Sequence, residues 1–149
     1  MAFRNATAEW TGEFEGGSGS FEGASGRLAG DYSAGSRFGD SGGTNPEELV
    51  AAAHASCFSM ALALALDQGG NPPESIRTEA KVQLSKDGEG FAIKKIDLVT
   101  VGRVPGVDDA AFQAAAQAAK AGCPISKALA AVPEITLDAT LETEAAGRS

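Results

Sequence analysis

One long stretch with almost no charge constrains the fold of this chain more than any other feature. It begins at Asn45 and Pro46, because asparagine suits a helix N-cap and proline suits the first helical position. Glu48 stands where the acid of a capping box belongs, and the helix is predicted to run to about Asp67. A helix that is apolar on most of its faces needs cover, in a core or against a partner. We therefore expect a buried central helix around which the other elements wrap.

Composition and charge limit the class of protein. The chain has 149 residues, of which 21% are charged and 43% hydrophobic, as in one soluble globular domain. The net charge of −8 disfavours nucleic acid and anionic membranes as partners, since both bind basic surfaces. The apolar stretch spans about 17 residues, the lower limit for a membrane span. No apolar run stands near the N-terminus, which predicts no signal peptide, no membrane partner and, by default, a cytoplasmic location.

The remaining residues predict an α+β fold of order βββ–α–ββ–αα–β in a single domain of residues 1–149. Alternating patterns and turn residues predict strands at residues 2–10, 18–23, 28–32, 76–86, 91–104 and 135–141. A second helix is expected from Asp108 or Asp109 to about Lys120, and a short one from Pro124 through Leu129. The glycine-rich segment before the central helix is expected to be an irregular loop that carries Arg37. Residues 144–149 are expected to form a flexible tail.

The two cysteines are the first candidates for chemistry. In a chain without an export signal, each is a small buried hydrophobe, a member of a redox pair or a metal ligand, rather than part of a stapling disulfide. Cys123 stands directly before a predicted helix start, where the helix macrodipole favours a thiolate. Cys57 lies in the middle of the central helix and gains no such help. Local electrostatics therefore favour Cys123 as the more reactive thiol.

Three further residues have both a functional and a structural interpretation. His54 lies three positions before Cys57 on the same helix face, so it either activates that thiol or packs as a hydrogen-bonded core residue, the commoner role. Glu47 either serves a site or complements the helix dipole, and Arg37 is either a ligand arm or a solvated loop residue. A metal site formed by His54, Cys57 and Cys123 is a weak alternative without a tight ligand motif. We predict no metal and no cofactor.

The chain resembles the OsmC/Ohr family, that is, osmotically inducible protein C and organic hydroperoxide resistance protein. The resemblance is carried by Thr44-Asn45-Pro46-Glu47-Glu48-Leu49, by Ala52-Ala53-His54-Ala55-Ser56-Cys57-Phe58-Ser59-Met60 and by Ala121-Gly122-Cys123-Pro124-Ile125-Ser126. It extends in order from Trp10 to the last strand. It is closest to the OsmC branch, in which an arginine precedes the Asn-Pro-Glu-Glu block, as Arg37 does here.

The resemblance implies a cysteine-based peroxidase that reduces organic hydroperoxides to alcohols and, less well, reduces hydrogen peroxide. Cys57 matches the peroxidatic cysteine and Cys123 the resolving one, which reverses the ranking from local electrostatics. Arg37 and Glu47 match the polar pair that activates the thiolate and holds the peroxide. The family passes through a cysteine sulfenate and an intramolecular disulfide, which a dithiol reduces, usually a lipoylated protein. Apolar residues near these site residues would either suit the alkyl group of a peroxide or belong to the core. The candidates are Phe38, Phe58 and Met60.

The positions of Glu47 and Cys57 on one helix predict the assembly. Ten residues of a straight helix separate them by about 15 Å along the axis and about 80° around it. Two antiparallel helices crossing near Ala52 would bring Glu47 of one chain beside Cys57 of the other. We therefore expect an intertwined homodimer with two shared active sites, to which Glu47 and Arg37 are given in trans. The alternatives are a non-catalytic dimer that binds an apolar ligand and a metal-thiolate protein.

Overall fold

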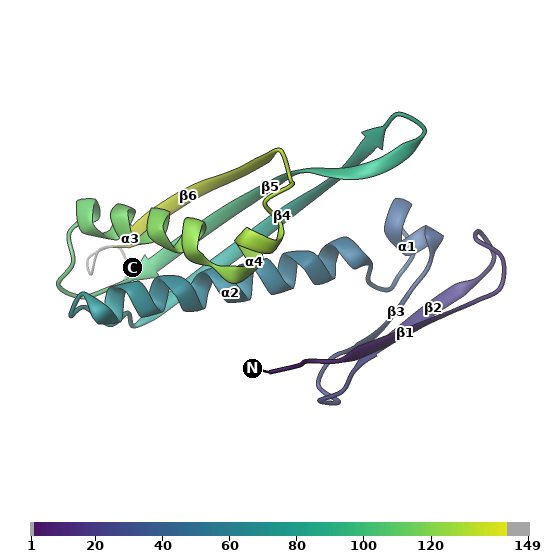
Figure 1. Cartoon of the computed structure of the whole chain (residues 1–149), viewed down its shortest axis with the longest axis horizontal. Helices are drawn as coiled ribbons and strands as arrows, with labels where there is room; N and C mark the ends of the chain where they lie inside the picture. Colours follow the sequence, from purple (N-terminus) through teal and green to yellow (C-terminus); the bar gives the residue numbers. More distant parts are fainter. Residues whose placement is uncertain (1, 143–149) are drawn as a thin grey trace. The chain divides into compact units, whose positions relative to one another are not determined.

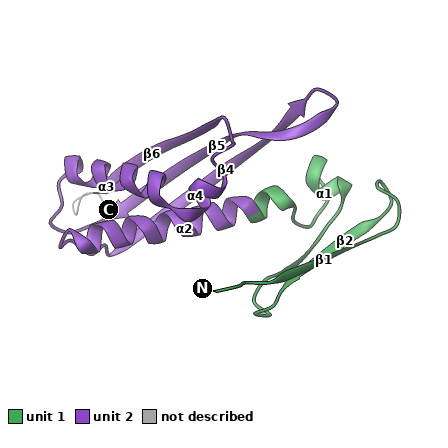
Figure 2. Ribbon diagram, viewed as in Figure 1, with its two compact units in different colours: residues 1–49 green, residues 50–149 purple. Residues whose placement is uncertain are grey.

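The elements follow the order βββ–αα–ββ–αα–β in residues 2–142, the part of the chain that the computed structural model describes (Figure 1). The expected tail of residues 144–149 lies outside the described residues. The chain divides after Leu49 into two compact units (Figure 2). Each unit contains one three-stranded sheet. The α+β class is confirmed, with one helix more than the sequence predicted.

The first sheet consists of β1 (Ala6–Thr11), β2 (Ser18–Gly23) and β3 (Ala29–Tyr32), antiparallel and in that order. The predictions for β2 and β3 are confirmed within one residue. The expected strand at residues 2–10 begins only at Ala6, because Ala6 pairs with Gly23, the last residue of β2. The sheet has a polar face and an aromatic face, since neighbouring residues of each strand alternate between the two.

A short helix replaces the irregular loop that the glycine content suggested. Helix α1 (Ala34–Phe38) begins with a reciprocal capping box between two serines. The Ser36 amide donates to Ser33 Oγ at 3.0 Å, and the Ser33 amide donates to Ser36 Oγ at 2.8 Å. The expectation of a loop at Arg37 was therefore wrong, because these two side chains complete a helical turn despite the nearby glycines.

Helix α2 (Pro46–Gln68) has the start and the length that the sequence predicted. The Glu48 amide donates to Asn45 Oδ1 at 2.8 Å, which confirms the N-cap. The Glu48 carboxylate accepts from the Thr44 hydroxyl, where the sequence suggested a capping-box contact. The helix runs without interruption, so Glu47 and Cys57 lie ten residues apart on one helix.

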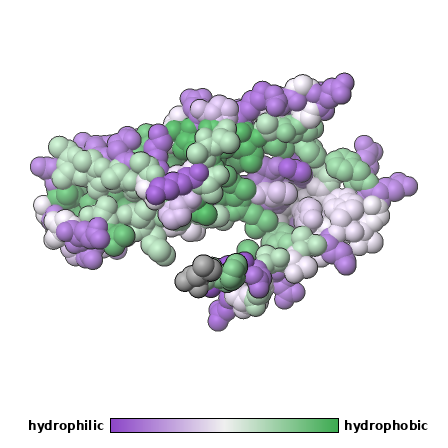
Figure 3. Space-filling model, viewed as in Figure 1, coloured by the Kyte–Doolittle hydropathy of each residue, from purple (hydrophilic) through white to green (hydrophobic). Residues whose placement is uncertain are grey.

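Within the second unit, α2 has one buried stripe. Spaced four residues apart, its members lie on the same face of the helix; they are His54, Phe58, Leu62 and Leu66. On the opposite side Met60 is 76% exposed and Leu64 57% exposed. By length and composition alone α2 could cross a membrane, but core helices of soluble proteins meet the same criterion. Figure 3 shows apolar surface over the helices of the second unit.

The second sheet packs against the helices of its own unit. Strands β4 (Ser75–Asp87) and β5 (Gly90–Arg103) form the predicted hairpin, and β6 (Glu134–Glu142) pairs parallel to β5. The crossover to β6 contains α3 (Asp109–Gly122) and α4 (Pro124–Ala128), as predicted. The core joins side chains of α2, β5 and α3, among them Phe58, Leu62, Ile96, Leu98 and Phe112. A Cβ at Gly102 would lie 2.6 Å from the Phe112 ring, so this strand position requires glycine.

Candidate active site

Arg37 and Glu47 form one pair of candidate site residues, within the first unit. Helix α1 carries Arg37 in its last turn, and α2 carries Glu47 in its first turn. Arg37 Nε donates to Glu47 Oε1 at 2.9 Å and to Oε2 at 3.2 Å, while Nη2 donates to Oε1 at 2.5 Å. Glu47 is only 9% exposed, so this paired geometry fixes the guanidinium plane. The remaining N–H donors of the Arg37 guanidinium have no partner among the described residues and are available to an anion.

An aromatic pocket of about 320 Å³ adjoins Arg37 in the same unit. It is lined by Trp10, Phe14, Tyr32, Ser33, Ala34, Arg37 and Phe38. Trp10 and Tyr32 both pair with Gly19 in the strand register, and their ring centroids lie 5.8 Å apart. A Cβ at Gly19 would lie 2.4 Å from the Tyr32 ring, so the glycine makes room for it. The sequence pointed to Phe38 but missed the other aromatics, whose meeting depends on this register.

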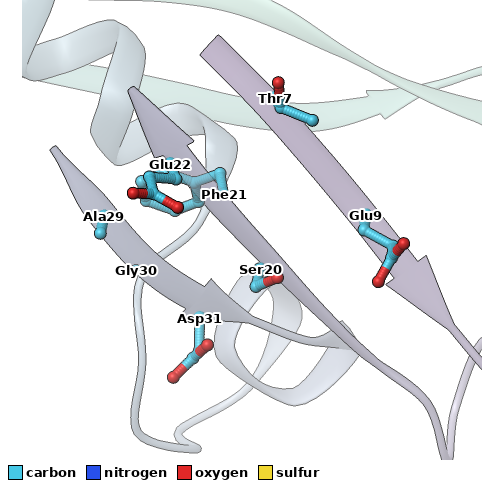
Figure 4. Close-up of a pocket in the computed structure, with 8 residues that line it drawn as sticks. All are labelled: Thr7, Glu9, Ser20, Phe21, Glu22, Ala29, Gly30 and Asp31. Atoms are coloured by element: carbon cyan, nitrogen blue, oxygen red, sulfur yellow. The ribbon is translucent and has the colours of Figure 1, made fainter. Parts of the chain in front are cut away.

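The opposite face of the same sheet carries a polar hollow of about 550 Å³ (Figure 4). Its lining comes from all three strands and includes the acids Glu9, Glu22 and Asp31. Glu9 and Asp31 both pair with Ser20, so the side chains of Glu9, Ser20 and Asp31 form one row across the sheet. Neither thiol nor imidazole belongs to this lining, so the hollow offers no thiol chemistry.

Cys57 and Cys123 form a second pair of candidate site residues, within the second unit. Both are free thiols; Cys57 on α2 is half-buried and Cys123, directly before α4, is fully buried. Burial raises the pKa of Cys57, and its hydrogen bond to Cys123 raises this pKa further, while a backbone hydrogen bond from Ile125 opposes both. None of the groups that shift this pKa is a cation.

The surroundings of Cys123 favour its thiolate. Burial alone would raise the pKa of Cys123, but hydrogen bonds from Cys57, from the amide and hydroxyl of Ser126 and from the Ile125 amide together lower it. The amides belong to the start of α4, which is the helix start that the sequence placed after Cys123. The sequence ranked Cys123 above Cys57 in thiol reactivity on local electrostatics. The directions of the two pKa shifts in the single chain agree with that order. A positive charge beside Cys57 would be needed to reverse it.

His54 is a buried, hydrogen-bonded core residue, which was one of its two interpretations. Its Nε2 lies 2.8 Å from Ser126 Oγ, and its Nδ1 has no partner among residues 2–142. Burial lowers the pKa of His54 and so favours the neutral ring. Sequence reasoning missed Ser126, although it stands in the same short block as Cys123. Within the described part of the chain, no three His, Cys, Asp or Glu side chains are grouped as metal ligands.

The predicted site residues thus meet as two pairs, Arg37 with Glu47 and Cys57 with Cys123. Phe58, which the sequence offered as a neighbour of an alkyl peroxide, is fully buried among core side chains, so its core interpretation is the right one. Met60 points away from that core and is exposed. Phe38 lines the aromatic pocket beside Arg37.

Comparison with known proteins relates this arrangement to one family. The family model for OsmC-like protein matches residues 39–138. Peroxiredoxin OsmC of Escherichia coli (strain K12) is 48% identical over 141 residues, which cover 94% of this chain and 97% of that protein. Organic hydroperoxide resistance protein-like 2 of Staphylococcus epidermidis is 33% identical over 108 residues, or 70% of this chain and 74% of that protein.

Solved structures agree with this comparison. The crystal structure of an organic hydroperoxide resistance protein OsmC from Legionella pneumophila has a TM-score of 0.72 at 25% identity and covers 94% of this chain and 99% of that chain. The fold, the paired thiols and the 48% identity to a peroxiredoxin define a cysteine-based peroxidase, an antioxidant enzyme of the stress response. The chain belongs to the OsmC/Ohr family, and among these relatives its identity to OsmC is the higher.

Proposed function

We propose that this protein reduces organic hydroperoxides to alcohols, and hydrogen peroxide less well, with Cys57 as the peroxidatic and Cys123 as the resolving cysteine. The observation that carries the proposal is the pair of free thiols in one unit, one half-buried on α2 and one fully buried directly before α4, of which Cys123 raises the pKa of Cys57. A half-buried thiol can meet a peroxide, and its buried neighbour is placed to close a disulfide. The names of the relatives, which are a peroxiredoxin and organic hydroperoxide resistance proteins, support this substrate class.

The proposed reaction has three steps. The Cys57 thiolate attacks the outer peroxide oxygen, the O–O bond breaks, and the alkoxide takes a proton and leaves as the alcohol. The Cys123 thiolate then attacks the sulfur of the Cys57 sulfenic acid, and the departing hydroxide takes a proton to become water. A dithiol finally reduces the Cys57–Cys123 disulfide by exchange. We expect a lipoylated protein to be this donor, and a cytoplasmic location for the reaction.

Arg37 and Glu47 supply the charge that the thiol pair lacks. A guanidinium beside Cys57 would lower the thiol pKa and donate hydrogen bonds to both the sulfur and the peroxide. Glu47 fixes the guanidinium by accepting from both Nε and Nη2. The aromatic pocket beside Arg37 offers an apolar surface to the alkyl group of the peroxide. This pocket supports a preference for organic hydroperoxides over hydrogen peroxide.

The continuous α2 helix supports a homodimer with shared sites. Glu47 and Cys57 are about 15 Å apart along this helix. We propose that residues 1–149 act as one domain and that the Arg37–Glu47 pair of each chain serves the thiols of its partner. The exposed side of α2 includes small residues that permit close approach of a second helix, namely Ala52, Ala53 and Ser56. Its exposed Met60 and Leu64 supply apolar surface for the contact.

Subunit complementation tests the shared site. We expect chains with Cys57→Ser to be inactive as homodimers and chains with Arg37→Ala to be nearly inactive, and a tagged heterodimer combines one chain of each kind. If Arg37 acts in trans, the heterodimer contains one site with both residues intact and recovers about half of the wild-type turnover per dimer. If Arg37 acts within its own chain, no site is intact and the heterodimer stays inactive, which would contradict the proposal. Steady-state turnover of the purified heterodimer is the measurement.

The proposed activity itself is tested by turnover of the purified protein. We expect dihydrolipoamide to sustain the reduction of a fatty-acid or tert-butyl hydroperoxide, with kcat/KM about tenfold or more above that for hydrogen peroxide, because burial of an alkyl group adds binding free energy. Thioredoxin as the donor is the comparison that identifies the reductant class. A protein that loses no thiols on mixing with any of these peroxides would refute the function.

A further inference from the structure

One buried serine fastens the short helix that carries Arg37. Ser36 directly precedes Arg37 on α1 and is only 7% exposed. Its Oγ accepts from the Ser33 amide at 2.8 Å and donates to the Thr44 carbonyl at 2.7 Å. The same Oγ lies 3.2 Å from the Ser33 carbonyl, but a hydroxyl has one hydrogen and its shorter contact is with Thr44. The side chain of Ser36 therefore links α1 to the residue that precedes the N-cap of α2.

The N-cap of α2 fastens the same serine a second time. Asn45 Nδ2 donates to the Ser36 carbonyl at 3.2 Å, while Asn45 Oδ1 accepts from the Glu48 amide at 2.8 Å. Carbonyls in the last turn of a helix have no partner inside that helix, so one side-chain amide serves both the end of α1 and the start of α2. Each end of this amide meets its complement, which fixes its orientation.

Capping alone does not explain an asparagine at position 45. An N-cap needs only an acceptor, and serine or aspartate supplies one about as well. The N-cap of α3 is such a case, since the Asp108 carboxylate accepts from the Ala111 amide at 2.8 Å. Neither serine nor an ionised aspartate has a donor where Asn45 presents Nδ2. The contact with Ser36 is therefore the contribution that asparagine makes beyond capping.

The connection between the two helices supplies little stiffness of its own. Three of the five residues between α1 and Thr44 are glycines, and one of them, Gly43, has a φ of +115°. Glycine permits many backbone conformations, so such a connection defines the position of α1 poorly. The two contacts of Ser36 define it instead. They hold Arg37 where its Nε and Nη2 donate to Glu47 Oε1 at 2.9 and 2.5 Å.

We propose that Ser36 and Asn45 are positioning residues for the peroxide step, which hold α1 against the start of α2 and so aim the free donors of the Arg37 guanidinium. The inference rests on the proposed function, in which Arg37 donates to the sulfur and the peroxide. Neither Ser36 nor Asn45 meets the reacting atoms, and both act through Arg37. A misplacement of about 1 Å in a catalytic group is sufficient to slow a reaction about a hundredfold, so the position of α1 affects the rate.

Small exchanges at the two positions separate anchoring from capping. Asn45→Ser keeps an N-cap acceptor but is too short to reach the Ser36 carbonyl. Ser36→Ala removes the hydroxyl that joins α1 to Thr44. Asp108→Ser is the matched control, because it makes the same kind of N-cap exchange on α3 in the second unit. Rapid mixing with an organic hydroperoxide gives the second-order rate constant of the peroxide step, from the sulfenic acid trapped with dimedone.

We expect Asn45→Ser and Ser36→Ala each to lower this rate constant about tenfold, and Asp108→Ser to leave it unchanged. In an Arg37→Ala background neither Asn45→Ser nor Ser36→Ala should slow the step further, because the side chain through which both residues act is gone. A residue that only stabilises the fold would slow both backgrounds alike. Equal losses with and without Arg37 would therefore overturn the inference.

A second readout follows the ion pair without turnover. The Nε–H signal of Arg37 in a nitrogen-15 NMR spectrum, assigned by its loss in Arg37→Lys, reports the contact with Glu47 through hydrogen exchange. This exchange should be about fivefold or more faster in Asn45→Ser and Ser36→Ala than in the wild type, and unchanged in Asp108→Ser.

Two results would overturn the inference. The first is unchanged exchange of the Arg37 Nε–H in both Asn45→Ser and Ser36→Ala. The second is faster exchange in these variants with no loss in the rate of the peroxide step. A wild type that forms no sulfenic acid would instead refute the proposed function, and faster exchange in the two variants would then still support the anchoring of Arg37.

Discussion

Cys57→Ser is expected to abolish hydroperoxide reduction, by a factor of at least about a thousand, while the protein stays folded. A serine hydroxyl does not ionise near neutral pH and cannot take up the peroxide oxygen. The side chain is half-buried and the exchange changes one atom, so we expect a loss of about 1 kcal/mol or less in the free energy of unfolding. Alcohol formation and a thermal melt of the same sample measure the two quantities.

Cys123→Ser is the matched control for this variant, because it removes the other thiol of the same pair. It should still react once with peroxide and then stop, with one thiol lost per chain where the wild type loses two and Cys57→Ser loses none. Excess peroxide should then drive Cys57 to the sulfinic acid, which mass spectrometry detects. The opposite pattern, in which Cys57→Ser reacts and Cys123→Ser does not, would show that local electrostatics rank the thiols correctly and that the assignment of roles is reversed.

Arg37→Ala is expected to lower kcat/KM for the peroxide about a hundredfold at neutral pH. Burial raises the pKa of Cys57, and loss of the guanidinium leaves that effect uncompensated, so fewer molecules carry the thiolate. The rate of the peroxide step should therefore rise with pH over a range displaced upward from that of the wild type. Arg37→Lys should recover only part of the loss, since an ammonium cannot reproduce the paired contact with Glu47.

A second arginine–glutamate pair provides the control for Arg37. Arg103 joins β5 to Glu142 on β6, with Nε and Nη2 donating to Oε1 at 3.0 and 2.5 Å. Arg103→Ala removes a similar ion pair from the second unit, so any general effect of losing such a pair on stability appears in both variants. The peroxide step should change in Arg37→Ala alone. Equal losses in the two variants would mean that Arg37 acts on stability rather than on the thiol.

Local sequence patterns predicted those elements whose ends are set by neighbouring residues. The Asn45 cap and Pro46 located the start of α2, and strict alternation with an Asp87–Gly90 turn located the β4–β5 hairpin. Helix α1 was missed because glycine content was weighed above the Ser33 and Ser36 pair, which stabilises the turn through side chains. A capping box of two serines is the pattern that would have revealed it.

The geometry of the site depended on contacts that no local pattern contains. Arg37, Glu47, Cys57 and Cys123 were singled out from the sequence, and the structure joins them in two pairs. The meeting of Trp10 with Tyr32 required the register of three strands at Gly19. The contact of His54 with Ser126 spans 72 residues and depends on how α4 packs against α2. Phe58 kept two interpretations in the sequence, because an apolar residue beside a reactive one has the same pattern whether it faces a ligand or the core.

The serine capping box of α1 limits the conformational freedom of the segment that carries Arg37, here called the guanidinium arm, before a peroxide binds. A helix of five residues is too short to be stable by itself, since nucleation is unfavourable and few turns follow to offset it. Here the Ser33 and Ser36 contacts and the Glu47 carboxylate order the arm while the chain folds. The loss of conformational entropy is then complete before any encounter with substrate. Binding requires no ordering of this arm, which suits an enzyme whose substrate is small and offers few contacts of its own.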